Sequence, residues 1–342
     1  MHERRHKRMS ESNLLSIGIV GFGGRQLSVD AIVRLCKHPS VSKFHVFWNQ
    51  PSPEIRIQLA EVTSFTPKIE ITYSEINTGS AGGYARVLEG YRDNDSSAYL
   101  LLMDDDLRPA ENCLEAMLAA AAMYADALNE TLVLAYRPGL PELADLVARN
   151  LPIRRPRPGC CVGFHFINLL NPKYEAIRRD EASGGYFIGS APWGGLMIPR
   201  RALDKLGLPR EDFFLYAEDY ELTSRFVWQG GKIVLVPEAI MLDNDTAWNA
   251  VGGKVSNLKR RMLLLPDIKV FHEVRNRNFM ARKYYPGNFT TYLINKSIFL
   301  ASAYLLGLGH MKLARARLIH RAVNDGEHMA ACEHNCDIIP IK

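Results

Sequence analysis

The sequence has few cysteines and little excess charge. Six cysteines are spread over 342 residues, a density below that of small secreted domains held together by disulfides, so we expect a cytoplasmic protein. The formal net charge of +5 is too small to indicate a nucleic-acid partner, although it is compatible with an anionic substrate. Hydrophobic residues make up 47% of the chain, which is ordinary for a folded globular protein.

Long uninterrupted apolar segments are scarce as well. No apolar segment of signal-peptide length follows the basic residues 1–13, which we expect to form a disordered tail. Residues 289–309 are apolar, but Asn295 and Lys296 leave too short a run for a membrane-spanning helix of ~20 residues. Four basic residues follow: Lys312, Arg315, Arg317 and Arg321. This pattern suits peripheral attachment to the inner face of the cell membrane; a core or oligomer-interface helix is the alternative.

A dinucleotide-binding motif is incomplete. The predicted first strand, 14–20, ends in Gly21-Phe-Gly-Gly24, and glycines at that place can cradle a pyrophosphate. Gln26 stands where the third glycine of the motif belongs, and no acid ends the predicted second strand, 44–48. The sequence therefore disfavours a nicotinamide cofactor.

One apolar run stops abruptly at three acids. Residues 98–103 read as a buried parallel strand, and Asp104, Asp105 and Asp106 follow it directly. The carboxyl edge of an open α/β sheet is where ligands bind. Adjacent carboxylates repel one another unless a cation compensates, and Mg²⁺ and Mn²⁺ prefer carboxylate and phosphate oxygens. The cluster indicates a metal that holds a phosphorylated substrate, with a solvated acidic turn as the alternative.

Strands and helices alternate along the first half of the chain, which predicts an α/β fold with a mostly parallel, Rossmann-like sheet flanked by helices. We expect strands at 14–20, 44–48, 68–73, 98–103 and 131–136, and helices at 28–37, 53–63 and 112–124. Residues 138–185 show no clear periodicity and are interpreted as a variable loop or small subdomain near a substrate.

Three further segments carry candidate site residues. The segment from Asn77 to Arg86 contains three glycines before a helix, where a ligand can approach the backbone and the helix N-terminus favours negative charge; a structural turn is the alternative. Trp193 precedes two glycines and can be a core aromatic or an exposed platform for a sugar ring. A later helix begins with acids at Glu218, Asp219 and Glu221. Acids there also stabilise a helix by themselves, through its dipole and an i+4 pair with Arg225.

The order of these motifs resembles family 2 glycosyltransferases of the GT-A fold, in particular their bacterial galactofuranosyl- and rhamnosyltransferase-like branch. The resemblance covers roughly residues 14–285. It is carried by Asn77-x-Gly-x-x-Gly-Gly, Asp104-Asp-Asp106, Trp193-Gly-Gly, Gly207-Leu-Pro, Phe213-Phe214, Glu218-Asp-Tyr-Glu221, Val236-Pro237 and Phe271-His-Glu-Val-Arg-Asn-Arg277. It implies a GT-A domain at 14–288 and a C-terminal helical segment at 289–342.

The resemblance also implies roles for individual residues. Asp104 and Asp106 would hold Mn²⁺ or Mg²⁺ on the donor diphosphate, with Asp105 facing the donor sugar. Asp219 would be the base of an inverting reaction. The expected donor-binding residues are Asn49, Asn77, Gly79, Gly82, Gly83 and Arg86, and the expected acceptor-binding residues are Trp193, Gly194, Glu218 and Glu221.

The chain departs from the pattern of that family at two places. Trp48 stands where relatives usually carry an acid that reads the nucleotide base. Asp243 stands where they often place a histidine as third metal ligand, and aspartate is itself a competent oxygen ligand. The expected function is a metal-dependent inverting transfer of galactofuranose or rhamnose, from a UDP- or dTDP-linked donor to a cell-envelope glycan or glycolipid. The alternative is a catalytically weak nucleotide-sugar-binding partner subunit.

Overall fold

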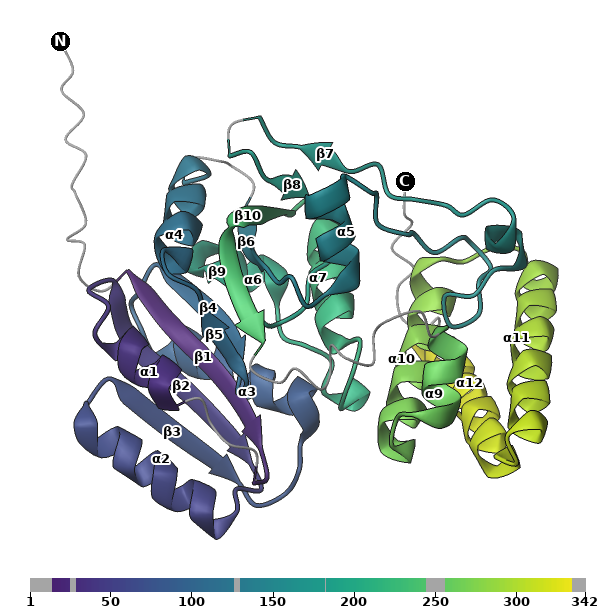
Figure 1. Cartoon of the computed structure of the whole chain (residues 1–342), viewed down its shortest axis with the longest axis horizontal. Helices are drawn as coiled ribbons and strands as arrows, with labels where there is room; N and C mark the ends of the chain where they lie inside the picture. Colours follow the sequence, from purple (N-terminus) through teal and green to yellow (C-terminus); the bar gives the residue numbers. More distant parts are fainter. Residues whose placement is uncertain (1–13, 25–28, 126–129, 182, 244–255, 334–342) are drawn as a thin grey trace.

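The structure is a computed structural model that describes residues 14–24, 29–125, 130–181, 183–243 and 256–333. The basic tail expected at 1–13 and the last nine residues of the chain lie outside the described residues. An α/β part contains the sheet, and a separate group of helices forms the other part (Figure 1).

Within the described residues, ten strands form one sheet in the order β3-β2-β1-β4-β9-β6-β10-β8-β7, with β5 paired to β10. The strands are β1 (Leu15–Phe22), β2 (Val41–Asn49), β3 (Ile69–Ser74), β4 (Tyr99–Asp104), β5 (Leu107–Pro109), β6 (Thr131–Tyr136), β7 (Arg178–Arg179), β8 (Tyr186–Phe187), β9 (Leu196–Pro199) and β10 (Lys232–Asp243). Neighbours β3, β2, β1 and β4 are parallel, as are β6 and β10, whereas β9 runs antiparallel between β4 and β6. The mostly parallel sheet predicted from the sequence is confirmed.

Helices cover both faces of the sheet. One face packs against α1 (Val29–Cys36), α2 (Pro53–Phe65) and α4 (Cys113–Met123). The other packs against α3 (Gly79–Asn94), α5 (Pro141–Arg149), α6 (Leu203–Leu206) and α7 (Glu218–Trp228). Short 3₁₀ turns lie at η1 (Phe166–Leu169), η2 (Arg200–Ala202) and η3 (Glu211–Phe213).

Burial on both faces explains the apolar run of β4. Leu101 and Met103 belong to the core on one side of the sheet, and Leu100 and Leu102 to the core on the other. A strand covered on both faces needs apolar residues at successive positions, and each such side chain contributes about 1.5–3 kcal/mol when fully buried. This packing fixes the point at which the strand ends, which is Asp104.

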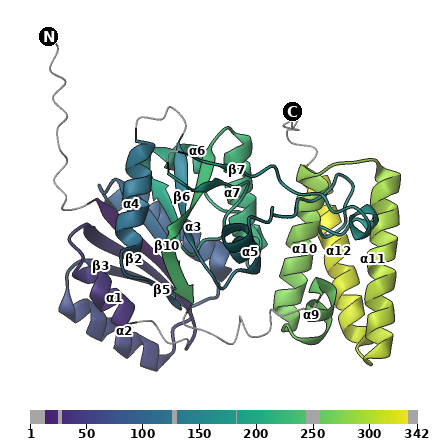
Figure 2. The same cartoon turned by 45° about the horizontal axis from the view of Figure 1, so that its top comes forward.

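The second part is a helical bundle with its own core. It contains α9 (Asn257–Leu263), α10 (Asp267–Tyr284), α11 (Phe289–Gly309) and α12 (Leu313–Glu333), and Figure 2 shows it beside the sheet. Val270 and Val274 of α10 pack in the same core as Phe299 and Ile319. The sequence-based division at residue 288 assigned α9 and α10 to the sheet domain. In the structure the apolar residues of α10 pack against α12, and the division at residue 288 stays a prediction.

Helix α11 continues through two polar residues, Asn295 and Lys296. It runs for 21 residues, and by length and composition alone it could cross a membrane, although 28% of its most apolar window is buried in the structure. Asn295 does not break it, because its buried amide binds the backbone of Phe166 and Gly159 at 2.8 and 2.9 Å. Lys296 pairs with Glu327. The expectation that the apolar run is too short to span is therefore wrong.

Candidate active site

The carboxyl edge of the sheet gathers the acids that the sequence singled out. Parallel pairing aligns the end of β1 with Asn49 of β2 and with Asp104 of β4. Asp243, at the end of β10, pairs in register with Leu107, the residue after Asp106, and Asp105 is buried. The three residues predicted to bind a metal thus lie on two segments that meet at this edge of the sheet. Asp104 ends β4 and Asp106 follows it, and Asp243 ends β10.

An arginine that the sequence analysis missed lies among these acids. Arg137 directly follows β6 and donates a hydrogen bond to Asp243, while its Nη1 lies 3.5 Å from Oδ2 of Asp104. Burial opposes the charge of the guanidinium, but Asp104 and Asp243 outweigh burial and raise its pKa. Its place one residue past a predicted strand, at the edge where ligands bind, was the available signal in the sequence.

Gly194 makes this arrangement possible. A Cβ at that position would lie 2.5 Å from Nη1 of Arg137 and 2.7 Å from Oδ2 of Asp104, so any larger residue would displace one of them. The structure places Gly194 against the acids, and its role toward an acceptor stays a prediction.

The acids at this edge can contribute only part of a divalent metal site. Within the described ranges, no three His, Cys, Asp or Glu side chains are grouped closely enough to hold a metal alone. Mg²⁺ and related ions are, however, usually bound by one or two carboxylates together with substrate phosphates. Asp104 and Asp243 do converge on one cation position, because a single guanidinium reaches both. The donor set therefore fits a metal whose coordination a phosphate completes.

The glycine-rich loop is held by protein contacts. Gly79 has φ +71°, and a Cβ there would lie 1.9 Å from the carbonyl oxygen of Phe214. Oδ1 of Asn77 accepts from the Gly79 amide at 2.9 Å. Asn49 accepts from the Thr78 amide at 2.8 Å and donates to the Gly79 carbonyl at 3.2 Å. These residues have a structural role, and their contact with a donor stays a prediction.

The remaining residues predicted to bind the donor lie further along α3. A Cβ on Gly83 would lie 2.5 Å from Cγ1 of Val20, so this glycine lets α3 approach β1. Gly82 is also buried in the first turns of α3. Arg86 pairs with Glu211 at 3.3 Å and is half-exposed, and the structure does not bring it to the acids.

A strained turn leads into helix α7. Three non-glycine residues before the helix have left-handed backbone angles, namely Phe214 (φ 62°), Tyr216 (φ 65°) and Ala217 (φ 68°). Such conformations cost free energy and persist where surrounding contacts impose them. Here the side-chain amide of buried Asn276, from α10, lies within 3.0 Å of the carbonyl oxygens of Phe213, Leu215 and Tyr216. Asn276 thereby fixes the start of α7, a role that only the folded chain reveals.

Two adjacent carboxyls, Glu218 and Asp219, occupy the first turn of α7. Glu218 accepts hydrogen bonds from the Ser80 hydroxyl and, at 3.3 Å, from the Trp193 indole. Asp219 accepts from the Tyr220 amide at 2.8 Å. Burial, and then the charge of Glu218, raise the pKa of Asp219 well above its usual range, and burial raises the pKa of Glu218. Paired carboxyls with raised pKa values are typical of acid–base sites.

Trp193 connects the two groups of acids from inside the core. It is 3% exposed and stacks on Tyr84 with 4.6 Å between ring centroids. The Tyr84 hydroxyl donates to Oδ1 of Asp104 at 2.8 Å. The expectation of an exposed platform for a sugar ring is wrong, and the core-aromatic interpretation is confirmed.

Glu221 lies apart from this site. Its carboxylate is 1% exposed, pairs with Arg225 at 3.2 Å and accepts a hydrogen bond from the Tyr284 hydroxyl. The bond from Tyr284 anchors α7 to α10, and the pair with Arg225 lies within α7. The i+4 pair with Arg225 that the sequence suggested is present, and contact between Glu221 and an acceptor stays a prediction.

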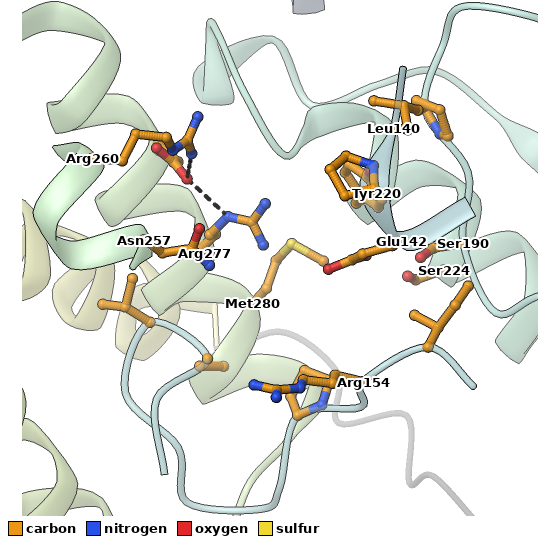
Figure 3. A pocket seen from close by; sticks show the side chains of 18 of the residues that line it. Leu140, Glu142, Arg154, Ser190, Tyr220, Ser224, Asn257, Arg260, Arg277 and Met280 are labelled. Atoms are coloured by element: carbon orange, nitrogen blue, oxygen red, sulfur yellow. Dashed lines mark hydrogen bonds and ion pairs between the residues drawn. The ribbon is translucent and has the colours of Figure 1, made fainter. Parts of the chain in front are cut away.

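A cavity of about 900 Å³ opens beside α7. Tyr220 and Ser224 of α7 line one wall and Arg277 of α10 lines the opposite wall, so the cavity lies between the sheet domain and the bundle (Figure 3). Residues of the 138–185 segment, including Arg154, form part of the lining. One wall of this cavity is thus formed by residues of the 138–185 segment, which shows no clear periodicity. Tyr220, the residue after Asp219, also lines the cavity.

Searches of family models and of curated proteins found no match for the chain. Among solved structures, GalNAc-T7, determined with UDP, GalNAc and Mn²⁺, is similar with a TM-score of 0.50 and 11% identity, over 84% of this chain and 55% of that one. The chain has a glycosyltransferase fold of the GT-A type. It spans about half the length of the GalNAc-T7 chain.

Two more glycosyltransferases resemble this GT-A chain more loosely. Residues 1–349 of TarS from S. aureus show 11% identity and a TM-score of 0.42, over 95% of this chain and 93% of that one. The mannosyltransferase PcManGT from Pyrobaculum calidifontis, in complex with GDP-Man and Mn²⁺, shows 14% identity and a TM-score of 0.43, over 94% and 87%. The galactofuranosyl- or rhamnosyltransferase branch stays a prediction.

Proposed function

We propose that this protein is an inverting glycosyltransferase that uses a nucleotide-diphosphate sugar and a divalent metal, Mn²⁺ or Mg²⁺. The observation that carries the proposal is the connection between two acid groups. Asp104, at the sheet edge, is joined to the Glu218–Asp219 pair through Tyr84 and Trp193. The GT-A fold supports it.

On the donor side, Asp104, Asp106 and Asp243 would hold the metal, and Asp104 and Asp243 already share one cation, the guanidinium of Arg137. The metal, when bound, acts as a Lewis acid on the leaving nucleotide diphosphate. Packing of Gly79 against Phe214 sets the start of α3 beside the turn before α7. Asn77 and Asn49 hold that loop in place for the donor.

On the acceptor side, Asp219 removes the proton of the attacking hydroxyl. A base works best when its pKa is near the working pH, and burial together with the charge of Glu218 raises the pKa of Asp219 well above its usual range. Glu218, held by Ser80 and Trp193, positions the acceptor next to Asp219. The cavity beside Tyr220 receives the rest of the acceptor.

The order of the sequence motifs favours galactofuranose or rhamnose as the transferred sugar, UDP or dTDP as the nucleotide, and a cell-envelope glycan or glycolipid as the acceptor. A lipid-linked acceptor suits a protein that works on the inner face of the cell membrane. Exposed apolar side chains on the bundle and on the neighbouring η1 turn support this location. Leu305 and Leu308 of α11 are 69% and 58% exposed, and Leu169 and Leu170 at η1 are 73% and 94% exposed.

Two of the four basic residues after α11 bond within the bundle, whereas Arg317 and Arg321 are exposed. Lys312 donates to the carbonyl of Leu263 at 3.4 Å, and Arg315 donates to that of Leu265 at 2.6 Å. Both side chains thus hold the bundle together. We propose that the membrane contact is mainly apolar, through α11 and the neighbouring η1 turn, which the bond from Phe166 to Asn295 joins.

Thermal unfolding with a panel of nucleoside diphosphates tests the proposal. UDP or dTDP with Mn²⁺ should raise the melting temperature of the wild type, because a ligand at 100 times its Kd stabilises the folded state by about 2.7 kcal/mol. Asp104→Asn should lose the shift and the surface variant Asp212→Asn should keep it. Nucleotide binding without any sugar transfer would indicate the catalytically weak partner subunit instead, and no binding by any nucleotide would contradict both functions.

A further inference from the structure

Arg137 occupies the place where the proposed function puts the metal. Its guanidinium donates to Asp243 and lies 3.5 Å from Asp104, so one cation already faces both carboxylates and offsets part of their negative charge. The inference below rests on the proposed function for the assignment of these two acids.

The protein packs closely around this guanidinium. Arg137 is 8% exposed, and the missing side chain of Gly194 provides the space for Nη1, since a Cβ would come within 2.5 Å of it. Nε of Arg137 is buried and has no hydrogen-bond partner among the described residues. The anchoring of the group therefore depends on the acids, because its hydrogen bond goes to Asp243 and its second close anion is Asp104.

A metal ion and a guanidinium cannot use the same carboxylate oxygens at once. Like charges at this separation also repel strongly where little water screens them. Arg137 takes Oδ1 of Asp243 and faces Oδ2 of Asp104, so a divalent cation that bridges the two acids through these oxygens has to displace it. The displaced side chain then needs another anion to compensate its buried charge.

We propose that Arg137 is a built-in competitor of the divalent cation, and that it lowers the affinity of the free protein for metal. In the metal-free protein it keeps the two carboxylates together and offsets part of their negative charge. Metal binding releases it beside the donor site, where the phosphates of a nucleotide sugar offer a matching anion for a guanidinium.

Mn²⁺ titrations of the nucleotide-free protein, followed by electron paramagnetic resonance of the free ion, test this. Arg137→Gln should bind Mn²⁺ at least tenfold more tightly than the wild type, because the competing charge is gone. Arg137→Lys should have an affinity for Mn²⁺ between those of the wild type and Arg137→Gln, since one ammonium cannot reach both acids as the guanidinium does. Arg149→Gln, which removes an exposed arginine paired with Asp145 at 3.3 Å, is the control and should bind like the wild type.

Several results would overturn the inference. Equal or weaker binding in both Arg137 variants would make the arginine a scaffold that aligns the acids. A similar gain in Mn²⁺ affinity in Arg149→Gln would show that the effect comes from the overall charge of the protein. A failure of every variant to bind Mn²⁺ would also contradict the inference. Assays of sugar transfer on the same preparations separate the two proposals. If the wild type transfers sugar but Arg137→Gln does not bind Mn²⁺ more tightly, only the competition between Arg137 and the metal is rejected. If Arg137→Gln binds Mn²⁺ more tightly but no donor supports transfer, only the proposed function is rejected.

Discussion

Oε1 of Glu218 accepts a hydrogen bond from the indole nitrogen of Trp193, 3.3 Å away. This contact ties the start of α7 to the carboxyl edge of the sheet, because Trp193 stacks on Tyr84 and Tyr84 donates to Asp104. A buried aromatic pair is stiff, so the distance between the sheet-edge acids and Asp219 is set by core packing. In a glycosyltransferase, that distance separates the leaving diphosphate from the base.

Trp193→Phe tests this connection. Phenylalanine keeps an aromatic ring against Tyr84 but donates no hydrogen bond to Glu218. The bond from Trp193 lowers the pKa of Glu218 against the larger effect of burial, so its loss should raise that pKa further. We predict that the pH–rate profile changes, because Glu218 and Asp219 titrate together, and that transfer falls about tenfold, since a hydrogen bond to a charged group contributes about 1.5 kcal/mol or more. Trp228→Phe, at the other end of α7, should leave the profile in place; an unmoved profile in Trp193→Phe would show that the indole bond does not act on the reaction.

Asp219→Asn should separate binding from chemistry. The variant keeps the shape of the side chain but cannot accept a proton, and a positioned base contributes roughly 10²–10⁴-fold. We predict a loss of transfer of at least about 10²-fold, with nucleotide and metal binding unchanged. Transfer near the wild-type rate would identify another base, with Glu218 as the next candidate, and loss of nucleotide binding would place Asp219 in the donor site.

The same variant should change stability with pH. The pKa of Asp219 is raised in the folded protein, so its ionisation costs stability at pH values above the unfolded-state pKa of ~3.9. Asp219→Asn should therefore melt at a higher temperature than the wild type at neutral pH, and the difference should vanish at pH values below that pKa. Asp212→Asn, at a half-exposed acid, is the matched control. A variant that melts lower than the wild type at neutral pH would contradict the raised pKa.

The glycine loop offers a paired test of structure. Gly79→Ala should destabilise the protein by about 1–3 kcal/mol or more, because φ is +71° and the new Cβ would meet the Phe214 carbonyl at 1.9 Å. Gly90→Ala, in the same helix, places its Cβ 3.5 Å from His45 and should stabilise by about 0.5–1 kcal/mol. Urea unfolding of both variants gives the comparison. Equal stabilities would mean that the loop does not pack against Phe214.

Apolar contact with a membrane can be measured by vesicle sedimentation. We predict that the wild type binds anionic vesicles and that the double variant Leu169→Ser, Leu170→Ser binds them less, because it removes two strongly exposed apolar side chains. Leu151→Ser, an exposed leucine after α5, should bind like the wild type. If the wild type does not bind vesicles at low salt, the exposed apolar side chains of η1 and α11 would instead form a contact with another protein.

The sequence predicted the local elements well because their signals are local. The apolar run of β4 and the acids after it identified both the strand and the edge where Asp104 lies. The burial of Trp193 was left open because it depends on Tyr84, more than a hundred residues earlier in the chain. Arg137 and Asn276 were missed for the same reason: each is an ordinary polar residue until the fold sets it against Asp243 or the turn before α7.

The most direct test of the central claim is the release of nucleoside diphosphate from a panel of UDP-, dTDP- and other nucleotide-linked sugars. With Mn²⁺ and without acceptor, the wild type should slowly release the nucleotide from one donor, and an acceptor glycan should accelerate the release. Chelator, Asp104→Asn and Asp219→Asn should each suppress it by about 10²-fold or more. No release from any donor, or release that continues at the full rate in chelator, would contradict the account.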